Sequence, residues 1–125
     1  MDMKLELVAI PVTDVDRAKA FYEQVGFNAD HDLRVSDEIR FVQLTPKGSA
    51  CSIAFGRGLS QMSPGSLQAI QVVIASADES LADLRSRGIA AEGVEDLPWG
   101  RFVSFADPDG NGWTLQELPD YSRQS

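Results

Sequence analysis

The chain of 125 residues has room for one domain with a hydrophobic core, and its 43% apolar and 24% charged content is typical of globular proteins. The net charge of −8 argues against nucleic acid and anionic membranes as partners, because both bind clustered lysine and arginine. The single cysteine excludes an intrachain disulfide, and without a long apolar run we expect neither a signal peptide nor a membrane span, hence a cytoplasmic protein.

The first half of the chain begins with a β-type run over 5–12, followed by a predicted helix. Thr13 or Asp14 can cap this helix by accepting hydrogen bonds from its first backbone amides. Apolar residues then recur at helical spacing until Gly26, where a left-handed cap is expected. Three strands are predicted next, near 28–35, 39–44 and 51–55.

The second half repeats this order. A strand over 67–75 leads into a helix whose capping box is Ser76 and Glu79 and which stops at Gly88. Strands follow near 89–94, 101–106 and 113–118, and the last two flank the turn sequence Asp-Pro-Asp-Gly-Asn-Gly of 107–112. This turn predicts a hairpin at the end of the chain.

A constant offset of 62 residues relates the two halves, since it takes Gly26 to Gly88 and Phe55 to Glu117. The repeat predicts an α+β fold of two βαβββ modules, 5–55 and 67–118, with a linker over 56–66 and a tail over 119–125, within one domain over 1–125. We expect each mixed four-stranded sheet to carry its helix outside and to curl into an incomplete barrel around a central cleft.

The run Asp-Val-Asp-Arg-Ala-Lys-Ala-Phe-Tyr-Glu-Gln-Val-Gly-Phe of 14–27 and the turn of 107–113 resemble the vicinal oxygen chelate superfamily. That superfamily includes glyoxalase I, extradiol dioxygenases, fosfomycin-resistance enzymes and bleomycin-binding proteins. The resemblance covers 5–117. It identifies the fold better than the reaction, because these motifs shape turns and helix caps.

Metal-dependent members of this superfamily hold a divalent cation with His, Gln or Glu side chains on the first and last strand of each module. The resemblance carries those positions onto Leu7, Ser52, Ala69 and Thr114, none of which is a good ligand. Neighbouring positions on the same strand faces add only Gln71 and Gln116 as plausible ligands. We therefore expect no usual metal site and no cofactor, with a divalent metal as the alternative.

Two further side chains are of chemically reactive types. His31, between Asp30 and Asp32, can be a general base or a metal ligand, but alternation places both carboxylates on the opposite strand face. We expect an edge-strand histidine in a solvated acidic segment. Cys51 has no recognisable His partner, and we expect it to be a small buried hydrophobic side chain on the helix side.

The predicted cleft combines apolar and neutral polar side chains, as small-molecule pockets do. Its apolar wall is predicted to contain Leu7, Ala9, Ala54, Ala69 and Val73. The ligand-binding residues are predicted to be Gln43, Ser52, Gln71, Trp99, Arg101, Thr114 and Gln116. Trp99 is suited to stacking on a planar ligand and Arg101 to pairing with a ligand carboxylate, whereas Trp113 is expected in the core. The alternative is that these side chains only pack and that the cleft is closed.

Three functions remain open. The first is a protein that binds or sequesters a small organic ligand without metal, as the bleomycin-binding branch does with a cationic drug. The second is a metal-dependent lyase, isomerase or dioxygenase, and the third is a non-catalytic interaction module. No catalytic residue is identified. The resemblance also implies a homodimer.

Overall fold

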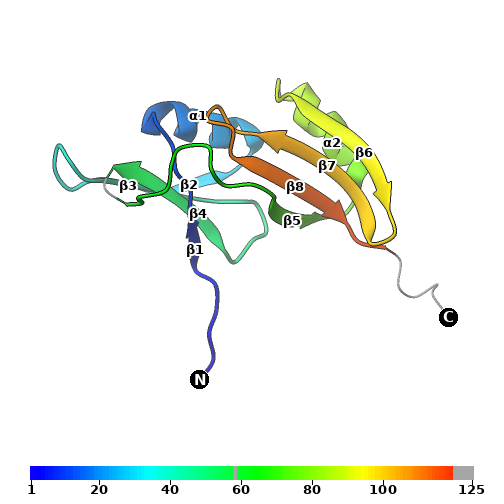
Figure 1. Ribbon diagram of the computed structural model, residues 1–125, viewed down its shortest axis with the longest axis horizontal. Helices are drawn as coiled ribbons and strands as arrows, with labels where there is room; N and C mark the ends of the chain where they lie inside the picture. Colours follow the sequence, from blue (N-terminus) through cyan, green and yellow to red (C-terminus); the bar gives the residue numbers. More distant parts are fainter. Residues whose placement is uncertain (58, 120–125) are drawn as a thin grey trace. The chain divides into compact units, whose positions relative to one another are not determined.

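The computed structural model describes residues 1–57 and 59–119, which divide into two compact units. The first unit contains 1–67 together with 107–111, and the second contains 68–106 and the chain from 112 onward. Figure 1 follows the chain through one helix and four strands in each repeat. Gly58 of the predicted linker and 120–125 of the predicted tail lie outside the described residues.

The first unit has the predicted βαβββ order. Its elements are β1 (Leu7–Ala9), α1 (Val15–Val25), β2 (Asn28–Arg34), β3 (Arg40–Thr45) and β4 (Ser52–Arg57). The sheet order is β1-β4-β3-β2, with β1 parallel to β4 and the other pairs antiparallel. The mixed four-stranded sheet is thus confirmed, and β1 is shorter than the predicted run.

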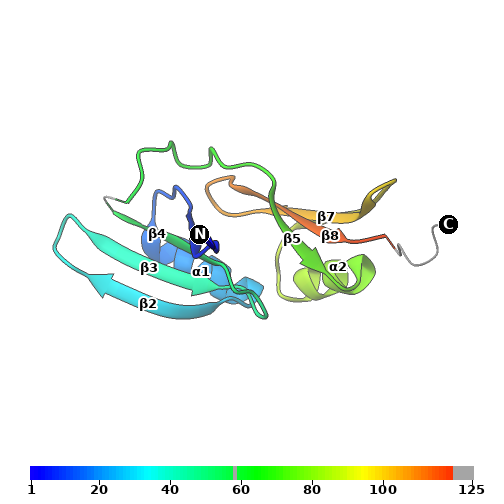
Figure 2. The ribbon, with the colours of Figure 1, turned by 90° about the horizontal axis from the view of Figure 1, so that it is seen from below.

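Helix α1 begins and ends where the sequence indicates. The Asp14 carboxylate accepts from the Arg17 amide at 3.0 Å, and Gly26 ends the helix at φ 116°. The helix packs on the sheet through Tyr22, which is fully buried and whose ring centroid lies 5.9 Å from that of Phe55. Helix α1 therefore lies against one face of its sheet, next to β2, β3 and β4 (Figure 2).

The second unit repeats the arrangement. Its elements are β5 (Ile70–Ile74), α2 (Ala77–Ser86), β6 (Ala91–Leu97), β7 (Gly100–Ala106) and β8 (Gly112–Glu117). The order is β5-β8-β7-β6, with β5 parallel to β8. Both modules are confirmed, while the curl into a barrel stays a prediction. Among the residues described, no helix is long and apolar enough to cross a membrane.

Helix α2 is capped by Ser76, whose hydroxyl accepts from the Glu79 amide at 3.2 Å. The Glu117 carboxylate accepts from the Ala77 amide at 2.8 Å, so the last strand completes the cap. Trp113 is 2% exposed and stacks on Phe105 at a centroid distance of 5.9 Å. The prediction of Trp113 as a core residue is confirmed.

The turn between β7 and β8 belongs to the first unit. Asp107 is 5% exposed, and its carboxylate accepts from the Tyr22 hydroxyl at 2.8 Å and from the Asn111 amide at 2.9 Å. The Asn111 side chain donates to the Pro11 carbonyl at 2.8 Å. The Asp109 carboxylate accepts from the Thr13 hydroxyl at 2.7 Å. The predicted hairpin turn thus also fixes the chain that enters α1.

Candidate functional site

Each sheet has one face covered by its own helix and one face without a helix (Figures 1 and 2). In the first unit, the residues on the covered face are buried: Val42, Leu44, Ile53 and Phe55. Because side chains alternate along a strand, the intervening residues point to the opposite side. We call that side the first helix-free face, and its members are Leu7, Ala9, Phe41, Gln43, Thr45, Ser52 and Ala54.

Two of the predicted ligand-binding residues, Gln43 and Ser52, lie on the first helix-free face. Gln43 is half-buried and lies directly opposite Ala54 on β4 and His31 on β2. Ser52 is 5% exposed and lies opposite Leu7. The structure therefore groups Gln43 and Ser52 with apolar residues of the predicted wall, Leu7 and Ala54.

A chain of polar side chains crosses one end of this face. The Ser52 and Thr45 hydroxyl oxygens are 2.7 Å apart, and the Thr45 hydroxyl donates to the Asp30 carboxylate. The Asn28 amide donates to the same carboxylate at 2.7 Å. The hydrogen bonds from Thr45 and then Asn28 lower the pKa of Asp30, so this carboxylate is ionised at neutral pH.

Asp30 and Asp32 do not share a strand face as the simple alternation predicts. The register of β2 against β3 shifts between Ala29 and His31, which makes Asp30 an extra residue in its strand. Asp30 consequently bonds Thr45, whereas Asp32 bonds Arg40 of β3 and Lys19 of α1. His31 lies on an exposed edge strand, as expected, but on the same face as Gln43.

The prediction that Cys51 is a buried side chain is wrong. Cys51 precedes β4 and is half-buried, and its thiol lies 3.7 Å from the Ser52 carbonyl. The strand begins one residue later than predicted, so the alternation that sends Ile53 to the core does not extend to Cys51.

The second helix-free face holds the predicted residues Gln71, Thr114 and Gln116, with Val73, Phe102 and Ser104 beside them. The Gln71 amide donates to the Gln116 oxygen at 2.6 Å. The Gln116 amide in turn donates to the Trp99 carbonyl at 2.9 Å, which fixes the turn between β6 and β7. Trp99 is 57% exposed, so its ring is accessible to solvent.

Arg101 lies on the covered face of the second sheet, apart from the other predicted residues of that unit. Its guanidinium donates to Asp96 at 2.7 Å and to Asp78 of α2 at 2.8 Å. The hydrogen bond to Asp78, followed by the one to Asp96, raises the pKa of Arg101. The hydrogen bond from Arg101 in turn lowers the pKa of Asp78. Because two carboxylates already neutralise it, the geometry weighs against Arg101 as the partner of a ligand carboxylate.

The strand register corrects one of the predicted metal positions. Leu7 lies opposite Ser52, but Thr114 lies opposite Gln71 rather than Ala69. Ala9 and Val73 are equivalent positions, because their partners Ala54 and Gln116 are 62 residues apart. Asp14 follows Ala9 by five residues, whereas Ser76 follows Val73 by three, so the segment that leads to the helix cap is two residues longer in the first unit. The offset of 62 thus holds for the helices and last strands but not for β1 and β5.

A divalent metal does not fit the corrected set of Leu7, Ser52, Gln71 and Thr114. Leu7 offers no donor atom, and the others offer neutral oxygens without an imidazole or carboxylate partner of the set. In residues 1–57 and 59–119, no group of three or more His, Cys, Asp or Glu side chains is placed to hold a metal ion.

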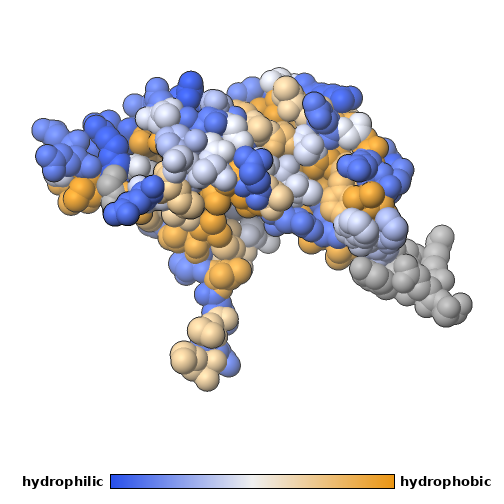
Figure 3. Space-filling view, viewed as in Figure 1, coloured by the Kyte–Doolittle hydropathy of each residue, from blue (hydrophilic) through white to orange (hydrophobic). Residues whose placement is uncertain are grey.

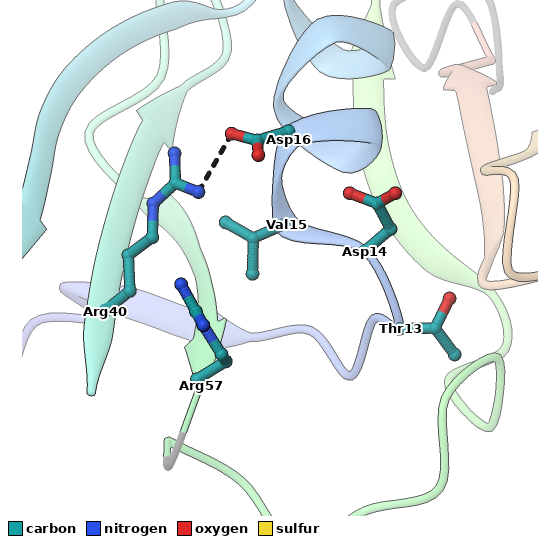
Figure 4. Close-up of a pocket in the computed structure, with 6 residues that line it drawn as sticks. All are labelled: Thr13, Asp14, Val15, Asp16, Arg40 and Arg57. Carbon is teal, nitrogen blue, oxygen red and sulfur yellow. Dashed lines mark ion pairs between the residues drawn. The ribbon is translucent and has the colours of Figure 1, made fainter. Parts of the chain in front are cut away.

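The first unit also has a polar depression of about 300 Å³ at the start of α1 (Figure 4). It is lined by Thr13, Asp14, Val15, Asp16, Arg40 and Arg57. Its charged groups are engaged with one another or with the backbone: Arg40 pairs with Asp16 at 2.8 Å, and Asp14 caps α1. This depression therefore has a structural explanation in the pairing that joins α1 to the sheet.

Asp30 and Thr45 are the site candidates that sequence reasoning missed. Their contact depends on the register shift in β2, which alternation along a single strand does not reveal. One indirect signal for Thr45 was present in the sequence. Thr45 and Asp107 occupy equivalent places in the repeated turn sequences Thr-Pro-Lys-Gly-Ser and Asp-Pro-Asp-Gly-Asn, which marks Thr45 as the polar residue at the end of its strand.

Comparison with known proteins gives consistent matches over nearly the whole chain. The sequence model of the Glyoxalase/Bleomycin resistance protein/Dioxygenase superfamily matches residues 4–115. TnmS3, an antibiotic binding protein from Streptomyces sp. CB03234, is 35% identical with a TM-score of 0.84, over 94% of this chain and 98% of that one. A superfamily member from Sphaerobacter thermophilus DSM 20745 is 30% identical with a TM-score of 0.81, over 93% and 98% of the two chains.

A relative in Bacillus subtilis (strain 168) is the uncharacterized protein YetH. It is 27% identical over 124 residues, which cover 94% of this chain and all of YetH.

Proposed function

The chain belongs to the Glyoxalase/Bleomycin resistance protein/Dioxygenase superfamily, and from this premise we propose that it binds and sequesters a small organic molecule without the usual metal. The observation that carries the proposal is that each helix-free face offers neutral hydrogen-bonding groups, Gln43 and Ser52 on the first and Gln71 and Thr114 on the second, but no group of cation ligands among the described residues. The antibiotic-binding function of TnmS3 supports the same reading.

The two helix-free faces supply what a binding protein needs. Apolar area comes from residues such as Phe41 and Phe102, and orienting amides come from Gln43 and Gln116. Trp99 adds an exposed ring of large area at low conformational cost. Thr114, Ser52 and Gln71 add hydrogen-bonding groups at fixed positions. Of the seven predicted contacts, we leave out only Arg101.

We propose binding rather than a metal-dependent lyase or dioxygenase reaction because, in residues 1–57 and 59–119, no group of three or more His, Cys, Asp or Glu side chains is placed to hold a metal ion. Elemental analysis of protein purified without chelator tests this choice. Less than one-tenth of an equivalent of Fe, Mn, Ni or Zn is expected, and a stoichiometric transition metal would favour the enzyme.

The proposal also includes a homodimer in the cytoplasm. Exposed apolar side chains support self-association, and Figure 3 shows apolar surface around β1, where Leu5 is 78% and Val8 37% exposed. A lone cysteine that is half-buried is compatible with a reducing compartment.

A ligand panel tests the binding function directly. Thermal shift against antibiotics and metabolites should find compounds that raise the melting temperature, because a ligand selective for the folded state stabilises it. Such a hit should also quench tryptophan fluorescence, and the quenching should be lost in Trp99→Phe. Trp113→Phe is the matched control, because Trp113 is buried on the covered face. A panel without any stabilising compound would instead favour the interaction module.

A further inference from the structure

The chain of hydrogen bonds that joins the side chains of Ser52, Thr45 and Asp30 has a fixed direction. The ionised Asp30 carboxylate can only accept, so the single hydroxyl proton of Thr45 is donated to it. The Thr45 oxygen must then accept in the 2.7 Å contact with Ser52, which commits the Ser52 proton as well. Toward a ligand, this end of the first helix-free face therefore presents lone pairs and one negative charge.

This arrangement is unsuited to nucleophilic catalysis by Ser52. A nucleophilic serine needs a neighbouring base that takes up its proton, and an efficient base has a pKa near the working pH. The hydrogen bonds from Thr45 and Asn28 move the pKa of Asp30 in the opposite direction. These hydrogen bonds therefore leave acceptors for a ligand but do not activate Ser52.

The rest of the face grades from polar to apolar along β3. Thr45, Gln43 and Phe41 are alternate residues of one strand, spaced about 7 Å apart. Leu33 lies directly opposite Phe41 and is 55% exposed, so the end remote from Asp30 is apolar. A ligand that lies along this face meets a negative acceptor at one end, the Gln43 amide and the His31 imidazole in the middle and a hydrocarbon surface at the other.

We propose that Asp30, Thr45 and Ser52 form an anchor for the ammonium group of a small organic amine, whose apolar body lies along Gln43 and Phe41. This proposal rests on the proposed binding function and specifies the chemical class of its ligand, an organic amine. The exposed carboxylate supplies charge, and Ser52 with Thr45 fixes its position beside the sheet.

The test uses 1-naphthylmethylammonium and its neutral N-acetyl derivative as probes, titrated by amide NMR in low-salt buffer at pH 7. Wild type should bind the ammonium probe about tenfold more tightly, the factor expected for hydrogen bonds to a charged group. The largest shifts should fall on Asp30, Thr45 and Ser52.

Asp30→Asn should abolish the preference for the ammonium probe, because an amide can donate to Thr45 and reverse the chain. Thr45→Val should reduce it, because it disconnects Ser52 from the carboxylate. Asp37→Asn removes one exposed carboxylate from the β2–β3 connection and should leave the preference intact, which controls for net charge. The amide spectra of the variants report whether they remain folded.

Equal affinity for the two probes in wild type, no binding of either probe, or equal losses in Asp30→Asn and Asp37→Asn would each overturn the anchor. The binding function itself is tested separately by the panel of antibiotics and metabolites, in which a neutral or anionic compound that raises the melting temperature would still support it. Failure of the anchor and failure of the binding function are thus separate results.

Discussion

Arg40 shows how single residues hold the first unit together. It is 4% exposed, and its guanidinium makes two hydrogen bonds to Asp32 of β2, at 3.0 and 2.8 Å. Its third nitrogen pairs with Asp16 of α1 at 2.8 Å, and Lys19 of α1 also reaches Asp32 at 3.1 Å. A buried cation is thus satisfied by partners from a strand and a helix, so removal of one partner leaves charge uncompensated.

The pH dependence of stability follows from Asp32. Hydrogen bonds from Arg40, and then from Lys19, hold the pKa of Asp32 well below its usual range. A carboxylate with a depressed folded-state pKa stabilises the fold above its unfolded pKa of about 3.9 and loses that contribution as the pH falls toward the folded value. We expect Asp32→Asn to cost about 1–3 kcal/mol of unfolding free energy at pH 7.

Urea unfolding of wild type and Asp32→Asn at pH 7, 5 and 3 measures this effect. The difference should be equal at pH 7 and 5 and smaller at pH 3. Asp37→Asn, with an exposed side chain, should change stability by less than about 0.5 kcal/mol. A difference that grows at low pH would contradict the assignment.

Individual side-chain positions were predictable where alternation is regular. Trp113 is buried as predicted and Leu115 is buried with it on the covered face, because β8 has no irregularity against β7. Asp30 was not predictable, because a register shift depends on the neighbouring strand as well as on its own sequence. The partners of Arg101 were missed for a related reason, since Asp78 and Asp96 come from different elements.

At the scale of elements, helix ends were predicted better than strand ends. Asp14, Gly26 and Ser76 act through local backbone hydrogen bonds, which the sequence encodes directly. The extent of β1 depends on pairing with β4, and the position equivalent to Leu7 depends on the length of the segment before each helix. A constant repeat offset cannot reveal such a local difference.

The segment after β4 provides a test of close packing at Gly65. Gly65 has φ 79°, and a Cβ there would lie 2.1 Å from the Asp109 carbonyl oxygen. Gly48 has nearly the same φ of 82° but has open space at the Cβ position. Gly48→Ala should therefore cost only the left-handed strain of about 1–2 kcal/mol.

Gly65→Ala should cost about 2 kcal/mol more than Gly48→Ala, because the backbone contact must also open. Chemical unfolding of the two variants gives the difference. Equal losses would mean that the turn of 107–111 moves away without cost.

At the scale of the whole molecule, the acidic chain carries two similar modules and exposes apolar side chains such as Leu33, Val73 and Trp99. Sedimentation velocity should give a mass twice the 13.6 kDa of the chain, in agreement with the proposed homodimer. The same mass should be found over a tenfold concentration range. A monomer mass throughout would exclude the dimer and leave each binding face to a single chain.

The placement of 107–111 in the first unit has a consequence for biosynthesis. When the first 67 residues have been synthesised, Asp107 and Asn111 have not. The hydrogen bonds from the Tyr22 hydroxyl to Asp107 and from Asn111 to the Pro11 carbonyl therefore cannot yet form. Domains usually fold as they emerge, but here the first unit is complete only when residues 107–111 have been translated. A product that terminates before residue 107 consequently lacks the hydrogen-bond partners of the buried Tyr22 hydroxyl and of the Pro11 carbonyl.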